Sequence, residues 1–143
     1  MKVMALIYGD EKTWEGAGDD ERKAVYGRYR AFGESAGEKV VGGAELASTS
    51  AATTVRVRDG ETIVTDGPFA ETKELVAGFW MWQCKSLEEA IEWVKRCPNP
   101  TGTESEIEIR QVFEAEDFGA EFTPELREQE ERLRAQIEKN QNE

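Results

Sequence analysis

The 143-residue chain contains no histidine. Histidine is the commonest general base near neutral pH and the commonest transition-metal ligand in proteins. Its absence excludes a Ser-His-Asp triad and a histidine-ligated zinc site. We therefore expect the protein to require no metal and no cofactor.

Cysteines and long apolar runs are also scarce. The two cysteines, Cys84 and Cys97, are too few for a disulfide scaffold, so we expect both to be reduced thiols. No run of about 18 apolar residues is present, which argues against a membrane-spanning helix. The apolar segment Met1–Tyr8 is too short for a signal peptide. These features predict a cytoplasmic protein.

Basic residues are few, with 18 Lys and Arg against 30 Asp and Glu and a formal net charge of -12. Binding to nucleic acid or to an anionic membrane depends on Lys and Arg, so both partners are disfavoured. The segment 114–143 has ten acidic and four basic residues and carries half of the net charge. The remaining body is only mildly acidic and could still hold a local basic site for a small anion.

Clear periodic patterns are present in the first part of the chain. Residues 3–8 are almost all apolar, which is typical of a strand buried on both faces. A polar loop over 9–18 follows, and Asp19 or Asp20 is a suitable N-cap for a helix that ends near Gly37. The apolar positions of this helix lie on one face, at Val25, Tyr29, Phe32 and Ala36.

The remaining elements continue the alternation of strands and helices. They are a strand over 40–46, a hairpin over 53–64 that turns at Asp59-Gly60, an aromatic-rich strand over 76–84, a helix from Ser86 and a last strand over 107–113. Ser86 and Glu89 form a capping-box pattern that marks the start of the helix. The order β-α-β, hairpin, β-α-β predicts a ferredoxin-like α+β domain over residues 1–113 with an inserted hairpin.

Residues 114–143 form a second, acidic segment. Thr123 can cap a helix, Pro124 suits its first position, and a narrow apolar stripe follows at Leu126, Leu133 and Ile137. Such a helix is marginal alone, so we expect it to dock on its own body or on a second subunit. Phe118 and Phe122 are suitable anchors, and the alternative is a helix that frays in solution.

Asp66 is the main candidate for a catalytic residue. It follows the hairpin in the sequence Asp66-Gly67-Pro68, where its carboxylate could orient a ligand or act as a base. The alternative is that Asp66 hydrogen-bonds within its own turn, as Asp before Gly or Pro often does.

Five further residues are candidates for ligand binding. Arg56 and Arg58 share one strand face and could grip a carboxylate or phosphate, with Lys73 completing the anion site. Tyr8 could supply a hydroxyl group at the end of the first strand. Trp82, on the same strand face as Trp80, could line an apolar pocket, although filling the core or the dimer interface is the simpler role. The arginine face could likewise be a solvated surface paired with Glu61.

Four segments resemble the DGPF branch of the YCII-related family. They are Met1–Glu11, Thr53–Asp59, Val64–Glu74 and Ser86–Pro98, of which Val64–Glu74 is the specific motif. The resemblance extends over about residues 1–113. It implies a ferredoxin-like subunit that pairs its sheet with a second copy to form a dimeric α+β barrel.

The resemblance also implies two different functions. Some members of the family resemble enzymes with a histidine-aspartate pair, and this chain lacks the histidine. Other DGPF domains are joined to sigma-factor-like regions, which this chain also lacks. Three hypotheses follow: a homodimer that binds a small ligand without a metal, a small-molecule lyase or isomerase that uses Asp66, and a transcription-linked protein-interaction module.

Overall fold

The computed structural model describes residues 1–68, 75–99 and 105–142. The elements follow in the order β1 (Lys2–Gly9), α1 (Glu11–Glu15), α2 (Asp19–Ala36), β2 (Val40–Glu45), β3 (Thr53–Arg58), β4 (Glu61–Asp66), β5 (Leu75–Gln83), α3 (Leu87–Val94), β6 (Glu106–Gln111) and α4 (Pro124–Gln141). Short 3-10 turns lie at Gly37–Lys39, Thr49–Ala51 and Ala115–Asp117.

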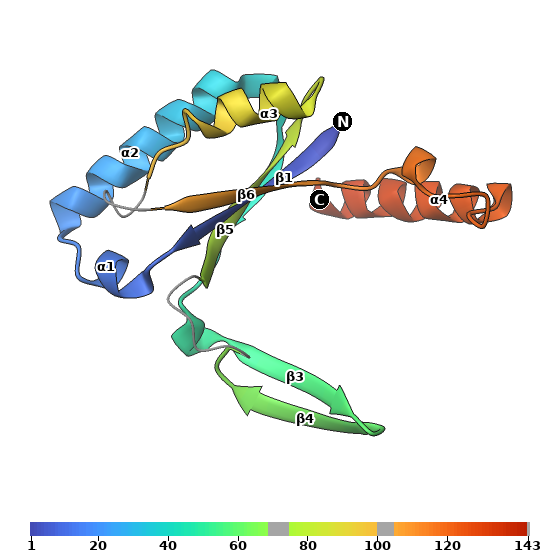
Figure 1. Cartoon of the computed structure of the whole chain (residues 1–143), viewed down its shortest axis with the longest axis horizontal. Helices are drawn as coiled ribbons and strands as arrows, with labels where there is room; N and C mark the ends of the chain where they lie inside the picture. Colours follow the sequence, from blue (N-terminus) through green and yellow to red (C-terminus); the bar gives the residue numbers. More distant parts are fainter. Residues whose placement is uncertain (69–74, 100–104, 143) are drawn as a thin grey trace.

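Four strands form an antiparallel sheet in the order β2-β5-β1-β6, while β3 and β4 form a separate two-stranded sheet. The helices α2 and α3 cover the same face of the four-stranded sheet (Figure 1). When the inserted hairpin is set aside, this is the strand order and layering of a ferredoxin-like α+β subunit. The predicted fold class is confirmed.

The core lies between this sheet and the two helices. Val3, Ala5 and Ile7 on β1 are buried beneath the helices. Phe32 of α2 contacts the rings of Trp80, Trp82 and Trp93 at centroid distances of 5.8, 6.0 and 6.1 Å. The alternate residues of β1 are only partly buried, so the expected burial of both strand faces is met on one face. No helix of the described residues covers the other face (Figure 1).

The helix α2 begins one residue earlier than an Asp cap would place it. Gly18 is the N-cap, and Asp19, Asp20 and Glu21 lie in the first turn, where their charges favour the positive end of the helix dipole. The segment predicted as a polar loop contains the short helix α1, whose N-cap Asp10 accepts a hydrogen bond from the Lys12 amide.

The helix α3 begins where the capping pattern predicts. The Ser86 hydroxyl oxygen accepts a hydrogen bond from the Glu89 amide at 3.2 Å. The Glu89 carboxylate in turn accepts from the amide of Lys85, at 2.6 Å, instead of from the amide of Ser86. This bond and a 3.0 Å ion pair with Lys39 hold the pKa of the Glu89 carboxyl below its ordinary value.

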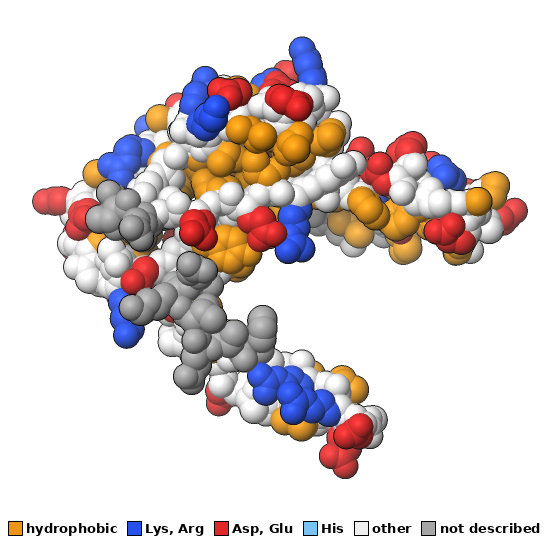
Figure 2. Space-filling model, viewed as in Figure 1, with side chains coloured by type: hydrophobic (Ala, Val, Ile, Leu, Met, Phe, Trp, Pro, Cys, Tyr) orange, Lys and Arg blue, Asp and Glu red, His pale blue; other side chains and the backbone are white. Residues whose placement is uncertain are grey.

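The hairpin β3–β4 stands away from the four-stranded sheet (Figure 1). Asp59 and Gly60 have φ values of 50° and 79°, as the predicted tight turn requires. The register pairs Val55 with Val64, so one face of the hairpin is rich in valine. The side chains of Val55, Val57 and Val64 are 60%, 70% and 62% exposed. Figure 2 shows hydrophobic and basic side chains together on this arm.

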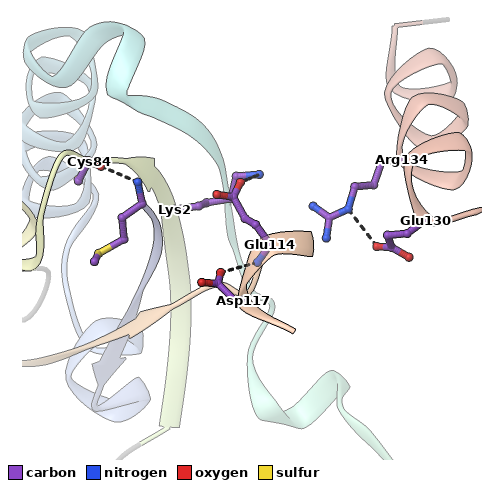
Figure 3. Close-up of polar contacts among 7 residues, drawn as sticks. Lys2, Cys84, Glu114, Asp117, Glu130 and Arg134 are labelled. Atoms are coloured by element: carbon purple, nitrogen blue, oxygen red, sulfur yellow. Dashed lines mark hydrogen bonds and ion pairs between the residues drawn. The ribbon is translucent and has the colours of Figure 1, made fainter. Parts of the chain in front are cut away.

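The helix α4 forms at the predicted residues and extends beyond the edge of the sheet (Figure 1). It has no buried residue, so its apolar stripe is not covered by its own subunit. The connection to the body is made by polar contacts that include a 3.6 Å ion pair between Lys2 and Glu114 (Figure 3). Phe118 contacts Phe113 and Phe122 at centroid distances of 5.6 and 4.9 Å. The predicted phenylalanine anchors therefore pack on each other and on Phe113, at the end of the body.

Candidate functional site

A cavity of about 760 Å³ lies between α2 and the β2 and β5 side of the sheet, with α1 at one end. Its walls are mainly apolar and include the rings of Trp14, Tyr26, Tyr29 and Trp80. The sequence pattern predicts the helix face and the strand that supply most of these residues. It does not predict that the helix and the sheet leave an open space between them.

Two glycines on neighbouring strands help to create this space. The register places Gly43 opposite Trp80 and Gly78 opposite Ile7, on the sheet face that the helices cover. A Cβ atom at Gly43 would lie 2.8 Å from the Phe79 carbonyl oxygen, and one at Gly78 would lie 2.7 Å from that of Ala44. The close approach of β2 and β5 therefore requires glycine, and the floor of the cavity lacks side chains at both positions.

The inner wall of the cavity is formed by neutral groups. The rings of Tyr29 and Trp80 are stacked with centroids 6.5 Å apart, and the Tyr29 hydroxyl donates to the Pro98 carbonyl oxygen at 3.2 Å. Burial raises the pKa of Tyr29. The Cys97 thiol is not among the described lining residues but hydrogen-bonds with Trp80, and burial raises its pKa to about 11. Both groups are protonated at neutral pH.

Three carboxylates lie among the lining residues, at Glu11, Glu15 and Glu45. The Glu11 carboxylate accepts hydrogen bonds from the Thr49 amide at 2.8 Å and from its hydroxyl at 2.6 Å. The Glu15 carboxylate accepts from the Ser48 hydroxyl at 3.3 Å. None of the described lining residues is Lys or Arg. The electrostatic character of the cavity is therefore acidic.

The helix α1 is fixed to α2 by Arg22. The guanidinium of Arg22 donates to the carbonyl oxygens of Trp14 and Glu15 at 3.2 and 2.8 Å, and it lies 5.7 Å from the centre of the Trp14 ring. The Trp14 ring meets the Tyr26 ring edge-on at 5.6 Å. The sequence contains one signal for α1, the N-cap residue Asp10 ahead of Trp14. The segment is too short for a helical pattern of apolar residues to be recognised.

The hairpin does not bring Asp66 and the two arginines together. The register pairs Asp66 with Thr53, which places Asp66 on the valine face, whereas Arg56 and Arg58 lie on the opposite face. Asp66 is exposed at the end of β4 and is not among the described lining residues of the cavity. Lys73 lies outside the described residues.

Tyr8 lies on the sheet face that the helices leave open, at a shallow depression beside β6. Its hydroxyl donates to Glu108 at 2.9 Å, and the Arg110 guanidinium donates to the same carboxylate at 2.7 Å. These two bonds, with that from Arg110 the stronger influence, lower the pKa of Glu108. Trp82 is 1% exposed and packs in the core, while its neighbour Trp80 lines the cavity.

Within residues 1–68, 75–99 and 105–142, no group of three or more Cys, Asp or Glu side chains is arranged to hold a metal ion. No helix in the same ranges is long and apolar enough to cross a membrane.

Residues 1–116 match the YCII-related domain. An uncharacterised protein of Rhizobium meliloti (strain 1021) is 38% identical over 120 residues, which cover 78% of this chain and 92% of that protein. Among solved structures, 5-chloro-2-hydroxyhydroquinone dehydrochlorinase (TftG) from Burkholderia phenoliruptrix AC1100, in complex with 2,5-dihydroxybenzoquinone, is similar at a TM-score of 0.46 and 14% identity. That similarity covers 82% of this chain and 100% of the other.

Proposed function

The chain belongs to the YCII-related family, and we propose that it is a homodimer that binds a small, largely apolar molecule without a metal. The observation that carries this proposal is the cavity between α2 and the sheet. Its volume of about 760 Å³ is within the usual range for small-molecule sites, and aromatic rings form much of its wall. Residues 66–69 spell Asp-Gly-Pro-Phe, which supports placing the chain in the DGPF branch.

The titratable groups in the cavity and beside it favour binding over acid-base catalysis. The Tyr29 hydroxyl is held by the Pro98 carbonyl oxygen, and its raised pKa keeps it protonated. The Cys97 thiol, with a pKa of about 11, is a poor nucleophile near pH 7 because little thiolate forms. The Glu11 carboxylate is used to hold Thr49 in place. These side chains therefore shape a binding site.

Calorimetric titration with a neutral aromatic probe, 1-naphthalenemethanol, tests the proposal. We expect saturable binding at one site per chain. Tyr26→Ala should weaken binding about fivefold because one aromatic contact contributes about 1 kcal/mol. Tyr26 is 50% exposed, so its truncation should not unfold the core. Phe118→Ala, on the remote extension, is the matched control and should leave affinity unchanged. No binding, or equal losses in the two variants, would contradict the proposal.

A lyase or isomerase that uses Asp66 is the second candidate. The Gly67 amide donates to the Ala52 carbonyl oxygen at 2.7 Å, and the Thr54 hydroxyl donates to the Gly67 carbonyl oxygen at 2.6 Å. These two bonds hold the turn through the backbone of Gly67 and do not use the carboxylate of Asp66. The exposed Asp66 side chain can therefore contact a substrate. The anion expected at Arg56 and Arg58 would bind on the hairpin, apart from the cavity. Because Asp66 lies on the face opposite both arginines, Asp66→Asn should abolish any lyase or isomerase turnover and leave both anion binding and binding of 1-naphthalenemethanol unchanged.

The proposal of a homodimer rests on the extent of uncovered surface. The chain exposes 10548 Å². A compact protein of 16.1 kDa exposes about 7,400 Å² by the usual scaling with mass. The excess of about 3,000 Å² is larger than the roughly 800 Å² that each partner buries in a standard interface. It includes the open sheet face, the valine face of the hairpin and the stripe on α4.

A second copy is the partner that suits these surfaces. Met4, Leu6, Phe79 and Met81 lie on the open sheet face and are only partly buried. Pairing this face with its equivalent in a second copy would complete a two-sheet core. The apolar side chains of the β3–β4 hairpin and of α4 would then be covered by the neighbouring subunit.

A further inference from the structure

We infer that the ligand of the cavity carries a positive charge and belongs to the class of hydrophobic amines, with an aromatic or alkyl body and an ammonium group. This inference rests on the proposed function, because it assigns the chemistry of the same cavity. It follows from the charges that line the cavity, the position of Glu45 and the aromatic walls.

The lining charges are all negative. Glu11, Glu15 and Glu45 contribute carboxylates, and no Lys or Arg is among the described lining residues. Two arginines lie close by. Arg22 is held by the carbonyl oxygens of α1, and Arg28 lies on an exposed position of α2, from which it influences Tyr29. No cation among the described lining residues balances the three carboxylates, which disfavours an anionic ligand.

Glu45 is the carboxylate best placed to meet an ammonium group. The register pairs it with Gly78, so it lies on the sheet face that α2 covers, opposite a residue without a side chain. It is among the lining residues of the cavity and is exposed to solvent. Glu11 and Glu15 have hydroxyl partners, whereas the Glu45 carboxylate has no hydrogen bond or ion pair to a side chain or amide of residues 1–68, 75–99 or 105–142.

The aromatic walls favour the same charge. The faces of Trp and Tyr rings attract cations, an effect of about 0.5–2 kcal/mol that grows as water is excluded. The rings of Trp14, Tyr26 and Trp80 line the cavity, with Trp14 and Tyr26 in edge contact and Trp80 on β5. An amine with an apolar body would therefore place its carbon atoms against these rings and its ammonium group at Glu45.

Three matched probes test this assignment by calorimetry at pH 7.5 and low salt. They share the naphthalene body: 1-naphthylmethylamine is a cation, 1-naphthalenemethanol is neutral and 1-naphthoic acid is an anion. We expect the amine to bind about tenfold more tightly than the alcohol, and the acid to bind most weakly. Added salt should weaken binding of the amine and leave that of the alcohol unchanged.

Substitution of Glu45 locates the preference. Glu45→Gln keeps the shape of the side chain and should remove about fivefold or more of the affinity for the amine, while the alcohol binds as before. Glu34→Gln is the matched control, since the Glu34 side chain is 72% exposed on α2 and does not line the cavity. The control should change neither affinity. Circular dichroism of each variant establishes that the fold is retained.

The outcomes separate the two proposals. If the alcohol binds but the amine shows no advantage, or if the acid binds most tightly, the charge assignment is overturned and the binding cavity stands. An amine preference that survives in Glu45→Gln would overturn the role of Glu45; Glu15→Gln would then be tested next. If none of the three probes binds, the proposed function fails and the charge assignment fails with it.

Discussion

Gly78 shows how a residue without a side chain determines both the sheet and the cavity. Its added Cβ would meet the backbone oxygen of Ala44 at 2.7 Å, and a backbone atom cannot rotate away. Gly27, on α2, has nothing within 4 Å of an added Cβ. Glycine lowers helix stability relative to alanine, whereas Gly78 is needed where β2 and β5 approach. The same substitution at the two positions should therefore act in opposite directions.

We predict that Gly78→Ala lowers the free energy of unfolding by about 1–3 kcal/mol, because β2 must move away from β5. Gly27→Ala should raise it by about 1 kcal/mol, since alanine is the better helix former at an open position. Urea titration of both variants measures the two changes. Equal effects, or a stabilised Gly78→Ala, would show that β2 and β5 do not approach this closely.

The Cys97 thiol makes stability depend on alkaline pH. Burial raises its pKa from 9.0 to about 11, so the folded state favours the neutral thiol. Because the folded pKa is the higher one, this contribution is complete below pH 9 and is lost as the pH rises towards 11. Tyr29 and Cys84, whose pKa values burial also raises, act in the same direction.

We predict that the melting temperature is steady from pH 7 to about pH 8.5 and falls between about pH 9 and pH 11. Cys97→Ala should reduce the slope of this fall, and alkylation of Cys97 by iodoacetamide at pH 8 should be faster in urea than in the native protein. A melting temperature that rises over this alkaline range would contradict the assignment. Rapid native alkylation of Cys97 would also do so.

At the scale of single elements, α3 depends on its N-cap residue, Ser86. The Ser86 side chain accepts the hydrogen bond from the Glu89 amide, and the helix buries Ala90 in the core. We predict that Ser86→Ala destabilises the protein by about 1 kcal/mol and lowers the melting temperature by roughly 4 °C. Ser105→Ala, at an exposed position outside the helices, is the control and should change it by less than about 1 °C. Equal melting curves for the two variants would refute the role of the cap.

Elements with a strong local signal were predicted from the sequence. The turn at Asp59-Gly60 and the cap at Ser86 each depend on residues close together in the chain, and both are confirmed. The helix α1 was missed because five residues are too few to show a period. Its position depends on the contacts of Arg22, which no local pattern reveals.

The site was harder to predict than the fold because a cavity is a property of the packing between elements. The alternation of side chains along β3 assigns Arg56 and Arg58 to one face of the hairpin. Asp66 can be assigned to the other face only when its pairing with Thr53 is known. The role of Trp80 in place of Trp82 depends on which part of the strand α2 covers. Sequence periodicity identifies the covered face and does not show where along it the covering helix leaves a space.

At the scale of the whole molecule, the β3–β4 hairpin and α4 project as two arms from the sheet and the helices that cover it (Figure 1). A two-stranded hairpin is marginal in water when neither of its faces is covered. The helix α4 is also marginal alone, because the side chains of its apolar stripe, Leu126, Leu133 and Ile137, are 43%, 61% and 54% exposed. Both arms are therefore expected to gain stability by contact with a second subunit.

We predict a dimer of about twice the 16.1 kDa subunit mass in sedimentation equilibrium at micromolar concentration. Replacing Val55 and Val57 with Thr keeps the β-branched shape and removes apolar surface from the valine face of the hairpin. This double variant should weaken the dimer at least about tenfold if the two side chains become buried between subunits. Ile63→Thr makes the same kind of change on the arginine face, where Ile63 is 45% exposed, and should have a smaller effect. A monomer at high micromolar concentration would refute the dimer, and equal effects of the two variants would show that the valine face is not the one that a second copy covers.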